Sequence, residues 1–80
     1  MKIPRDCDAT DLIRALKRLG YAATRQTGSH IHVTTQTGGE HHLTIPNHRP
    51  LKVGMLHALL KETAAHHHLA MDELIRVIKL

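Results

Sequence analysis

The sequence predicts an α+β fold in which a three-stranded antiparallel sheet carries its helices on one face. Apolar residues recur at helical spacing near both ends of the 80-residue chain, whereas polar and apolar residues alternate in its middle part. Short glycine-containing turns join the alternating segments, and strands joined by such turns pair as antiparallel neighbours. The expected order is helix, strand, strand, strand, helix, helix. The core should be aliphatic, because the chain has one tyrosine and no tryptophan or phenylalanine.

The first helix is expected over about residues 9–19. Asp8 is a typical N-cap residue, and Gly20 suits the left-handed conformation in which many helices end. Between them, apolar residues recur every three or four positions and form one face of the helix: Leu12, Ile13, Leu16 and Leu19.

Three strands are expected over residues 21–26, 30–35 and 41–45. Gly28-Ser29 fits the first turn between them, and Thr37-Gly38-Gly39-Glu40 is a strong hairpin signal for the second. Successive side chains of a strand point to opposite faces, so one face of the sheet packs against the helices and the other stays open. The open face is a candidate partner-binding surface that carries His32, Thr34, His42 and Thr44.

The C-terminal part of the chain predicts two further helices. A loop over residues 46–54 leads into a helix over about residues 54–64, and the run His66-His67-His68 is expected to separate it from the next helix. That last helix is expected over about residues 70–79, with an apolar stripe formed by Met71, Leu74, Ile75 and Ile78. The whole chain, residues 1–80, is expected to form a single domain.

Positive charge is concentrated in the middle of the chain. Residues 12–61 hold seven Lys and Arg side chains and one acidic side chain, a net charge of +6, together with six of the nine histidines. Such a field suits a polyanion, RNA or DNA, although a solvated basic surface without a ligand would have the same composition. The shortage of aromatic residues argues against nucleic-acid readers that stack bases on aromatic side chains.

The sequence has no feature typical of a secreted or membrane protein. The N-terminus lacks the apolar stretch of a signal peptide, and no apolar run approaches the ~20 residues that a bilayer requires. Cys7 stands alone, so no intrachain disulfide can form. These features predict a cytoplasmic protein with no membrane association.

Nine histidines in 80 residues raise the question of a metal site. His30 and His32 share a strand face and His66-His67-His68 are adjacent, but no cysteine joins them and carboxylates are rare nearby. His57 has no second histidine four residues on, as a metalloprotease motif requires. Ser29 beside His30 is no catalytic dyad, because adjacent strand residues point to opposite faces. We therefore expect neither a metal nor another cofactor.

Three motifs, in this order, resemble the HicA toxins, also called YcfA-like proteins. They are Gly28-Ser29-His30 before a hairpin, Ile45-Pro46-Asn47-His48 after it, and Leu51-Lys52-Val53-Gly54 ahead of a leucine-rich helix. The opening Lys2-Ile3-Pro4-Arg5-Asp6 also matches, so the resemblance covers residues 2 to about 64. It implies a fold like that of double-stranded-RNA-binding domains, cleavage of mRNA, and neutralisation by a HicB-type antitoxin.

The resemblance implies that His30 is the catalytic residue and that it acts without metal. By position alone, His30 would be interpreted as a turn residue that hydrogen-bonds a backbone carbonyl. RNA carries its own nucleophile, the ribose 2′-OH, and an imidazole that exchanges a proton near neutral pH suits this chemistry. The substrate is expected to contact the turn, two further histidines and nearby cations: Lys17, Arg18, Arg25, Gly28, Ser29, His32, His48 and Lys52.

Two features depart from the family pattern. Met55 stands where the family often has threonine, and the histidine-rich segment from His66 to Leu80 is longer than the family pattern predicts. Two other functions stay open at this point. One is a non-catalytic RNA-binding module or regulator with the same fold, and the other is a histidine-rich metal-handling protein.

Overall fold

The computed structural model describes residues 3–80 and shows the predicted order of elements. In chain order these are α1 (Ala9–Leu16), the 3₁₀ turn η1 (Lys17–Leu19), β1 (Ala22–Thr27), β2 (His30–Thr35), β3 (His41–Pro46), α2 (Val53–His67) and α3 (Met71–Ile78). Each strand begins and ends within one residue of its predicted bounds. The α+β fold with a three-stranded antiparallel sheet is confirmed.

Short polar and glycine residues set the ends of the first helical segment. The Asp11 carboxylate accepts a hydrogen bond of 3.0 Å from the Asp8 backbone N–H, which satisfies a donor ahead of the first turn of α1. The segment tightens into η1 and ends at Gly20, whose φ is +83°. A Cβ atom on Gly20 would lie 2.8 Å from the hydroxyl oxygens of Thr35 and Thr37, so both conformation and space require glycine there.

The sheet has the order β1-β2-β3, and both pairs of neighbours are antiparallel. Gly28 has a φ of +57°, which suits the first central position of a two-residue hairpin turn and lets Thr27 pair with His30. Across the second pair, His30 lies opposite Pro46. The register of the first pair shifts between Ala23 and Arg25, which leaves a bulge in β1.

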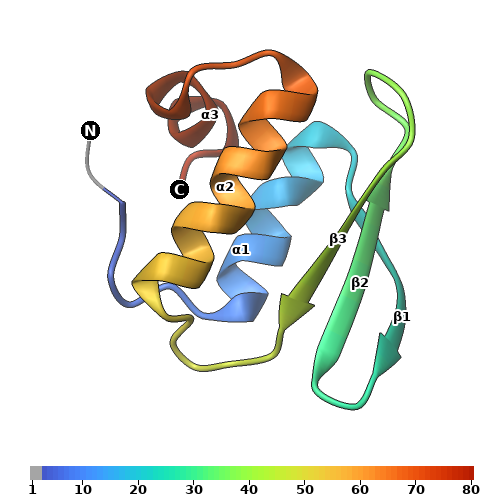
Figure 1. Cartoon of the computed structure of the whole chain (residues 1–80), viewed down its shortest axis with the longest axis vertical. Coiled ribbons are helices and arrows are strands. Elements are labelled where there is room, and N and C mark those ends of the chain that lie inside the picture. Colours follow the sequence, from blue (N-terminus) through green and yellow to red (C-terminus); the bar gives the residue numbers. More distant parts are fainter. Residues whose placement is uncertain (1–2) are drawn as a thin grey trace.

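The helices cover only one face of the sheet, and they cover it unevenly. Figure 1 shows all three helices on one side, with α2 beside β3 and β1 at the far edge. Every residue of β1 is exposed, whereas Val33 of β2 and Leu43 of β3 are buried. The face away from the helices is open, as predicted, because residues 3–80 place no element over it.

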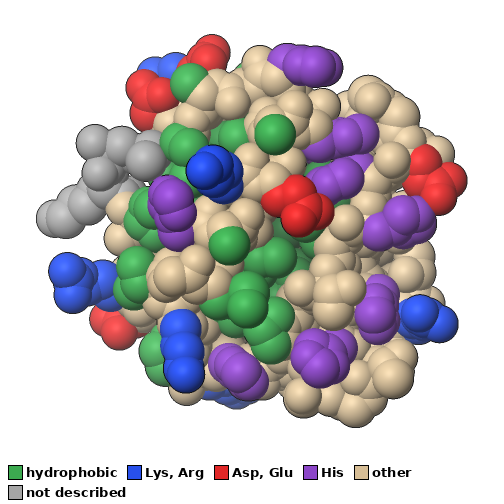
Figure 2. Space-filling view, viewed as in Figure 1, with side chains coloured by type: hydrophobic (Ala, Val, Ile, Leu, Met, Phe, Trp, Pro, Cys, Tyr) green, Lys and Arg blue, Asp and Glu red, His purple; other side chains and the backbone are tan. Residues whose placement is uncertain are grey.

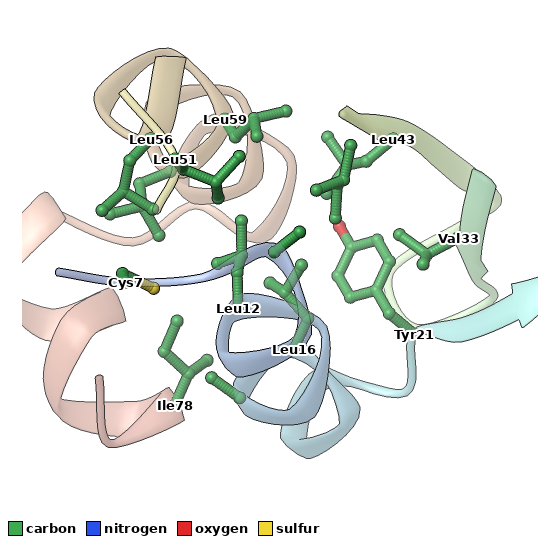
Figure 3. Packing of buried hydrophobic residues seen from close by; sticks show 14 of the residues in the cluster. Cys7, Leu12, Leu16, Tyr21, Val33, Leu43, Leu51, Leu56, Leu59 and Ile78 are labelled. Carbon is green, nitrogen blue, oxygen red and sulfur yellow. The ribbon is translucent and has the colours of Figure 1, made fainter. Parts of the chain in front are cut away.

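An aliphatic core lies between the sheet and the helices (Figure 3). Leu12 and Leu16 of α1 and Leu56 and Leu60 of α2 all belong to this cluster and are fully buried. The helix α3 belongs to the same cluster, to which it adds the fully buried side chains Leu74 and Ile78. Among residues 3–80, no helix is long and apolar enough to cross a membrane.

The second helix corrects the prediction for the histidine run. The run His66-His67-His68 is expected to separate two helices, but α2 continues through His67 and ends at His68, whose φ is +57°. Contacts with segments far away in the sequence hold the first two histidines in the helix: His66 bonds the loop between β2 and β3, and His67 bonds Tyr21. Local sequence contains no sign of these contacts.

Candidate functional site

The turn Gly28-Ser29-His30 projects at one end of the sheet. All three residues are exposed, and His30 is the first residue of β2. The Ser29 carbonyl accepts a 2.6 Å hydrogen bond from the Asn47 backbone N–H, which ties the turn to the loop that follows β3. The structure therefore presents the His30 imidazole to solvent on a braced turn, next to the Asn47-His48 segment.

Alternation along β2 places His30 and His32 on the same, open face of the sheet. Val33 and Thr35, one residue out of step with them, are buried toward the helices. His32 is half-buried, and its Nδ1 lies 3.3 Å from the hydroxyl oxygen of Thr44 on the neighbouring strand. The candidate catalytic residue thus has a second imidazole as its neighbour on this face.

The same face also carries Arg25 and a third histidine. Arg25 lies opposite His32 in the register of β1 and β2. His42 uses both ring nitrogens: Nδ1 is 2.7 Å from the Thr34 hydroxyl and Nε2 is 2.6 Å from the Glu40 carboxylate. The hydrogen bond from His42, followed by the attraction to its charge, lowers the pKa of Glu40 below the ordinary value for glutamate.

These side chains line a hollow of about 450 Å³ on the open face. Its walls come from all three strands and from the loop between β2 and β3: Thr24, Arg25, His32, Thr34, Gln36, Glu40 and His42. Figure 2, viewed as in Figure 1, shows further histidines over the half of the molecule that contains the sheet. Two imidazoles, a guanidinium group and a carboxylate are among these side chains, so the hollow can form hydrogen bonds with a substrate.

The loop after β3 is tied to the start of α1 and adds positive charge at this end of the molecule. The His48 carbonyl accepts a hydrogen bond of 3.1 Å from the Ala9 N–H, and the Leu51 N–H donates one of 2.8 Å to the Cys7 carbonyl. Lys52 is the N-cap of α2, whose first turn contains no acidic residue. The positive end of the helix dipole and the exposed Lys52 ammonium group therefore add together here.

Two sequence-predicted site residues, Lys17 and Arg18, lie elsewhere. They form η1 just before β1, whereas His30 follows β1, and six residues of strand span about 20 Å. Arg18 lines a separate hollow of about 320 Å³ between α1 and α3, together with Cys7 and Ile78. Burial raises the pKa of the Cys7 thiol there, and the nearby carboxylates of Asp11 and Asp8 raise it further.

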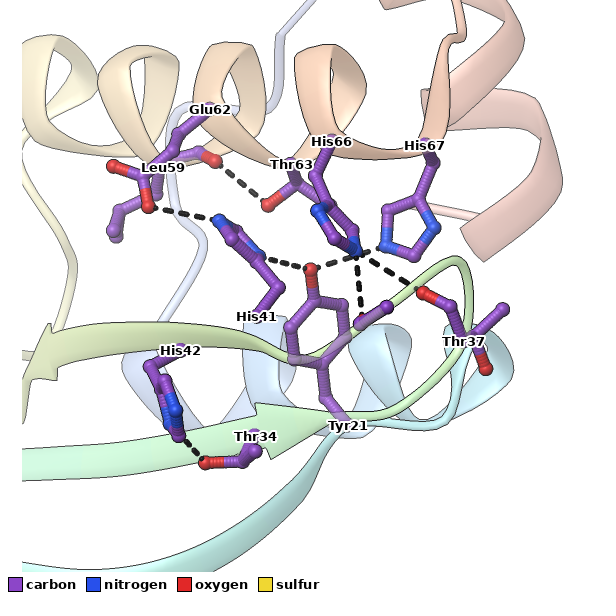
Figure 4. A network of polar contacts seen from close by, with 11 residues as sticks. Tyr21, Thr34, Thr37, His41, His42, Leu59, Glu62, Thr63, His66 and His67 are labelled. Carbon is purple, nitrogen blue, oxygen red and sulfur yellow. Dashed lines mark hydrogen bonds and ion pairs between the residues drawn. The ribbon is translucent and has the colours of Figure 1, made fainter.

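A cluster that sequence reasoning missed joins the sheet to the end of α2 (Figure 4). The Tyr21 hydroxyl is 2.7 Å from His41 Nδ1 and 3.1 Å from His67 Nε2, and His41 Nε2 is 3.1 Å from the Glu62 carboxylate. Burial, with a smaller contribution from the Glu62 charge, raises the pKa of Tyr21 to about 12, so the hydroxyl keeps its proton. These residues are 20 or more positions apart along the chain, except Glu62 and His67, so no spacing motif could reveal them.

One arrangement of protons satisfies the whole cluster when its histidines are neutral. The Glu62 carboxylate can only accept from His41 Nε2–H, which leaves His41 Nδ1 to accept from the Tyr21 hydroxyl. The Tyr21 oxygen then accepts from His67 Nε2–H. His66 stacks on His41 at 4.4 Å between ring centroids and donates from Nε2 to loop carbonyls 3.1 Å away, those of Thr37 and Gly39.

We expect this cluster to make the stability of the fold depend on pH. Burial lowers the pKa of His67, and the positive charges that His66, His41 and His68 carry at low pH lower it further. The unfolded chain therefore binds the His67 proton more readily, so the stabilisation is complete above the ordinary histidine pKa of about 6.5 and is lost as pH falls through the lower folded-state value. We expect the melting temperature to fall from pH 7.5 to pH 5 and to fall less in His67→Gln, which keeps a donor for Tyr21. Equal falls in the two proteins would contradict this assignment.

Within residues 3–80, no group of three or more His, Cys, Asp or Glu side chains is arranged to hold a metal ion. The clustered imidazoles instead face tyrosine, threonine, carboxylate and carbonyl partners.

Comparison with known proteins assigns the chain to a family. The family model described as the HicA toxin of bacterial toxin-antitoxin systems matches residues 9–64, which is more than half of the chain. Searches of curated proteins and of solved structures gave no match. The matched region includes the braced turn with His30, the open face of the sheet and the start of α2. The chain therefore belongs to the HicA toxin family of bacterial toxin–antitoxin systems.

Proposed function

We propose that this HicA protein is a metal-independent endoribonuclease that cleaves mRNA with His30. The observation that carries the proposal is the exposed His30 imidazole, which stands on a turn held by a backbone hydrogen bond at one end of the open sheet face, where Arg25 and His32 line a hollow. A toxin that acts inside a cell needs an essential target, and the positive charge of the middle of the chain suits a polyanion.

The chemistry requires little from the protein, because RNA contains its own nucleophile. In the proposed step, His30 removes the proton of the ribose 2′-OH as the 2′-oxygen bonds to the adjacent phosphorus. The P–O5′ bond breaks, and the departing 5′-oxygen takes up a proton and leaves as a hydroxyl. Negative charge then grows on the phosphate oxygens, and a cation held nearby stabilises it. We assign this role to Arg25, because it lies on the same face as His30 and pairs with His32 in the register of β1 and β2.

Binding in this proposal involves the cations at the His30 end of the molecule. The RNA backbone would run along the open face, past Gly28, Ser29, Arg25 and His32, toward His48 and Lys52. Lys17 and Arg18 stay outside this path, because η1 lies at the opposite end of β1.

The salt dependence of binding tests this path. Replacing either Arg25 or Lys52 by alanine removes one phosphate contact, so the slope of log affinity against log salt concentration should fall by about one. Lys17→Ala, which removes a cation of the same charge from the other end, should leave the slope unchanged. Equal slopes for all three variants and the wild type, measured by fluorescence anisotropy of a labelled RNA, would contradict the path.

The decisive test of the function is cleavage of a labelled single-stranded RNA by the purified protein in the presence of EDTA. The proposal expects cleavage products that end in a 2′,3′-cyclic phosphate, at a rate that the chelator does not change. RNA binding without cleavage would favour a non-catalytic RNA-binding module instead. Loss of cleavage with EDTA, restored by added zinc or magnesium, would favour a metal-dependent enzyme.

A toxin of this family works with an antitoxin, and we propose a HicB-type protein that covers His30. An acidic partner would complement the cationic end of the molecule and would associate rapidly through electrostatic steering. Reaction of His30 with diethylpyrocarbonate, followed by mass spectrometry, should then be slower in the complex than in the free protein. Equal reactivity would show that inhibition acts at another surface.

A further inference from the structure

His30 and His32 lie at the spacing that a pair of acid–base groups needs around one phosphodiester. They are two residues apart on the same face of β2, so their Cα atoms lie about 6.6 Å apart. The scissile phosphorus in RNA has the attacking 2′-oxygen on one side and the departing 5′-oxygen on the other. Two imidazoles at this spacing can each hydrogen-bond one of these oxygens.

We propose that His32 is a second catalytic residue, the general acid that protonates the departing 5′-oxygen. This inference rests on the proposed ribonuclease function and extends it from one histidine to two. His30 accepts the 2′-hydroxyl proton, the 2′-oxygen bonds to phosphorus, the P–O5′ bond breaks, and His32 gives its proton to the 5′-oxygen. The products are a 2′,3′-cyclic phosphate and a 5′-hydroxyl, and proton exchange with water restores both imidazoles.

The hydrogen bond to Thr44 orients the His32 ring for this role. Its Nδ1 is 3.3 Å from the Thr44 hydroxyl oxygen, which can accept from Nδ1–H whether the ring is neutral or protonated. The Nε2 atom then gains and loses the proton, and it belongs to a half-buried ring on the wall of the hollow. Arg25, opposite His32 in the register, would bind a non-bridging oxygen of the same phosphate.

The third histidine of this face does not meet the same requirement. Both ring nitrogens of His42 already face close partners, the Thr34 hydroxyl at 2.7 Å and the Glu40 carboxylate at 2.6 Å. His42 also pairs with Thr34, which is four residues from His30 along β2, whereas His32 is two residues from it. His32 is therefore the imidazole on this face that lies close to His30 and whose Nε2 has no hydrogen-bond partner among residues 3–80.

The experiment compares two RNA dinucleotides, one with an ordinary 5′-oxygen and one with sulfur in that bridging position. A thiolate departs without a proton, because thiols are far more acidic than alcohols, so the sulfur substrate does not need a general acid. With the oxygen substrate, His32→Ala should lose about 10²–10⁴-fold in rate. With the sulfur substrate, the rate of His32→Ala should recover to within about tenfold of the wild-type rate. The rate of His30→Ala should stay low on both substrates.

The pH profile supplies a second readout. The wild type should show a rate that rises and then falls with pH, and His32→Ala should lose the fall at high pH, because that limb reports deprotonation of the acid. His57→Ala, which removes an exposed histidine from α2, is the control and should keep both the rate and the profile. Circular dichroism establishes that each variant is folded.

The outcomes separate the two proposals. Wild-type cleavage that His30→Ala abolishes and His32→Ala leaves intact would overturn the role of His32 and support that of His30. If His32→Ala lost the same factor in rate on the oxygen and sulfur substrates, the general-acid role would also be overturned, because the loss would then come from weaker binding. Failure of the wild type to cleave either substrate would overturn both proposals.

Discussion

His30→Ala is expected to lower the rate of RNA cleavage by about 10²–10⁴-fold, the usual contribution of a positioned acid–base group. The fold should not change, because His30 is exposed at the first position of β2 and contributes nothing to the core. The free energy of unfolding of His30→Ala should differ from that of the wild type by about 0.5 kcal/mol or less. Rates with labelled RNA and thermal melts of the same preparations measure the two quantities.

The control for His30→Ala is Thr27→Ala, which changes the strand partner of His30 across the same hairpin. That variant removes an exposed side chain at the same end of the sheet, so a loss caused merely by disturbing the hairpin would appear in both proteins. Induced expression in cells gives a second readout: the wild type and Thr27→Ala should arrest growth, and His30→Ala should not. Wild-type cleavage rates in purified His30→Ala would refute the assignment.

Local signals predicted most of the fold. The strands follow from alternating side chains and from turns that need glycine, such as Gly28, and these are properties of neighbouring residues. The end of α2 could not be predicted in the same way. Its last residues, His66 and His67, are polar and have no helical signal of their own, and contacts with the hairpin loop and with Tyr21 hold them in place.

The candidate site was predictable only in part, for a related reason. The turn with His30 is a local motif, and alternation places His32 beside it on the open face. Charge counting, by contrast, cannot tell which cations share an end of the molecule, so Lys17 and Arg18 appeared equivalent to Arg25. β1 runs from η1 toward His30, so Lys17 and Arg18 lie at the opposite end of the strand from His30. The direction of β1 is set by the assembled sheet and not by local sequence.

The helix α3 lies beyond the region that the family model matches, yet we expect it to be essential for stability. Leu74 is fully buried in the common core, so Leu74→Ala should lower the free energy of unfolding by about 2–5 kcal/mol, through lost burial and the cavity left behind. For a domain of this size, each kcal/mol corresponds to about 4–8 °C in melting temperature. The matched control is Val77→Ala on the same helix, where the side chain is 43% exposed and the change should be small. Melting curves followed by circular dichroism would contradict the role of α3 if the two variants lost stability equally, because α3 would then not be packed as part of the core.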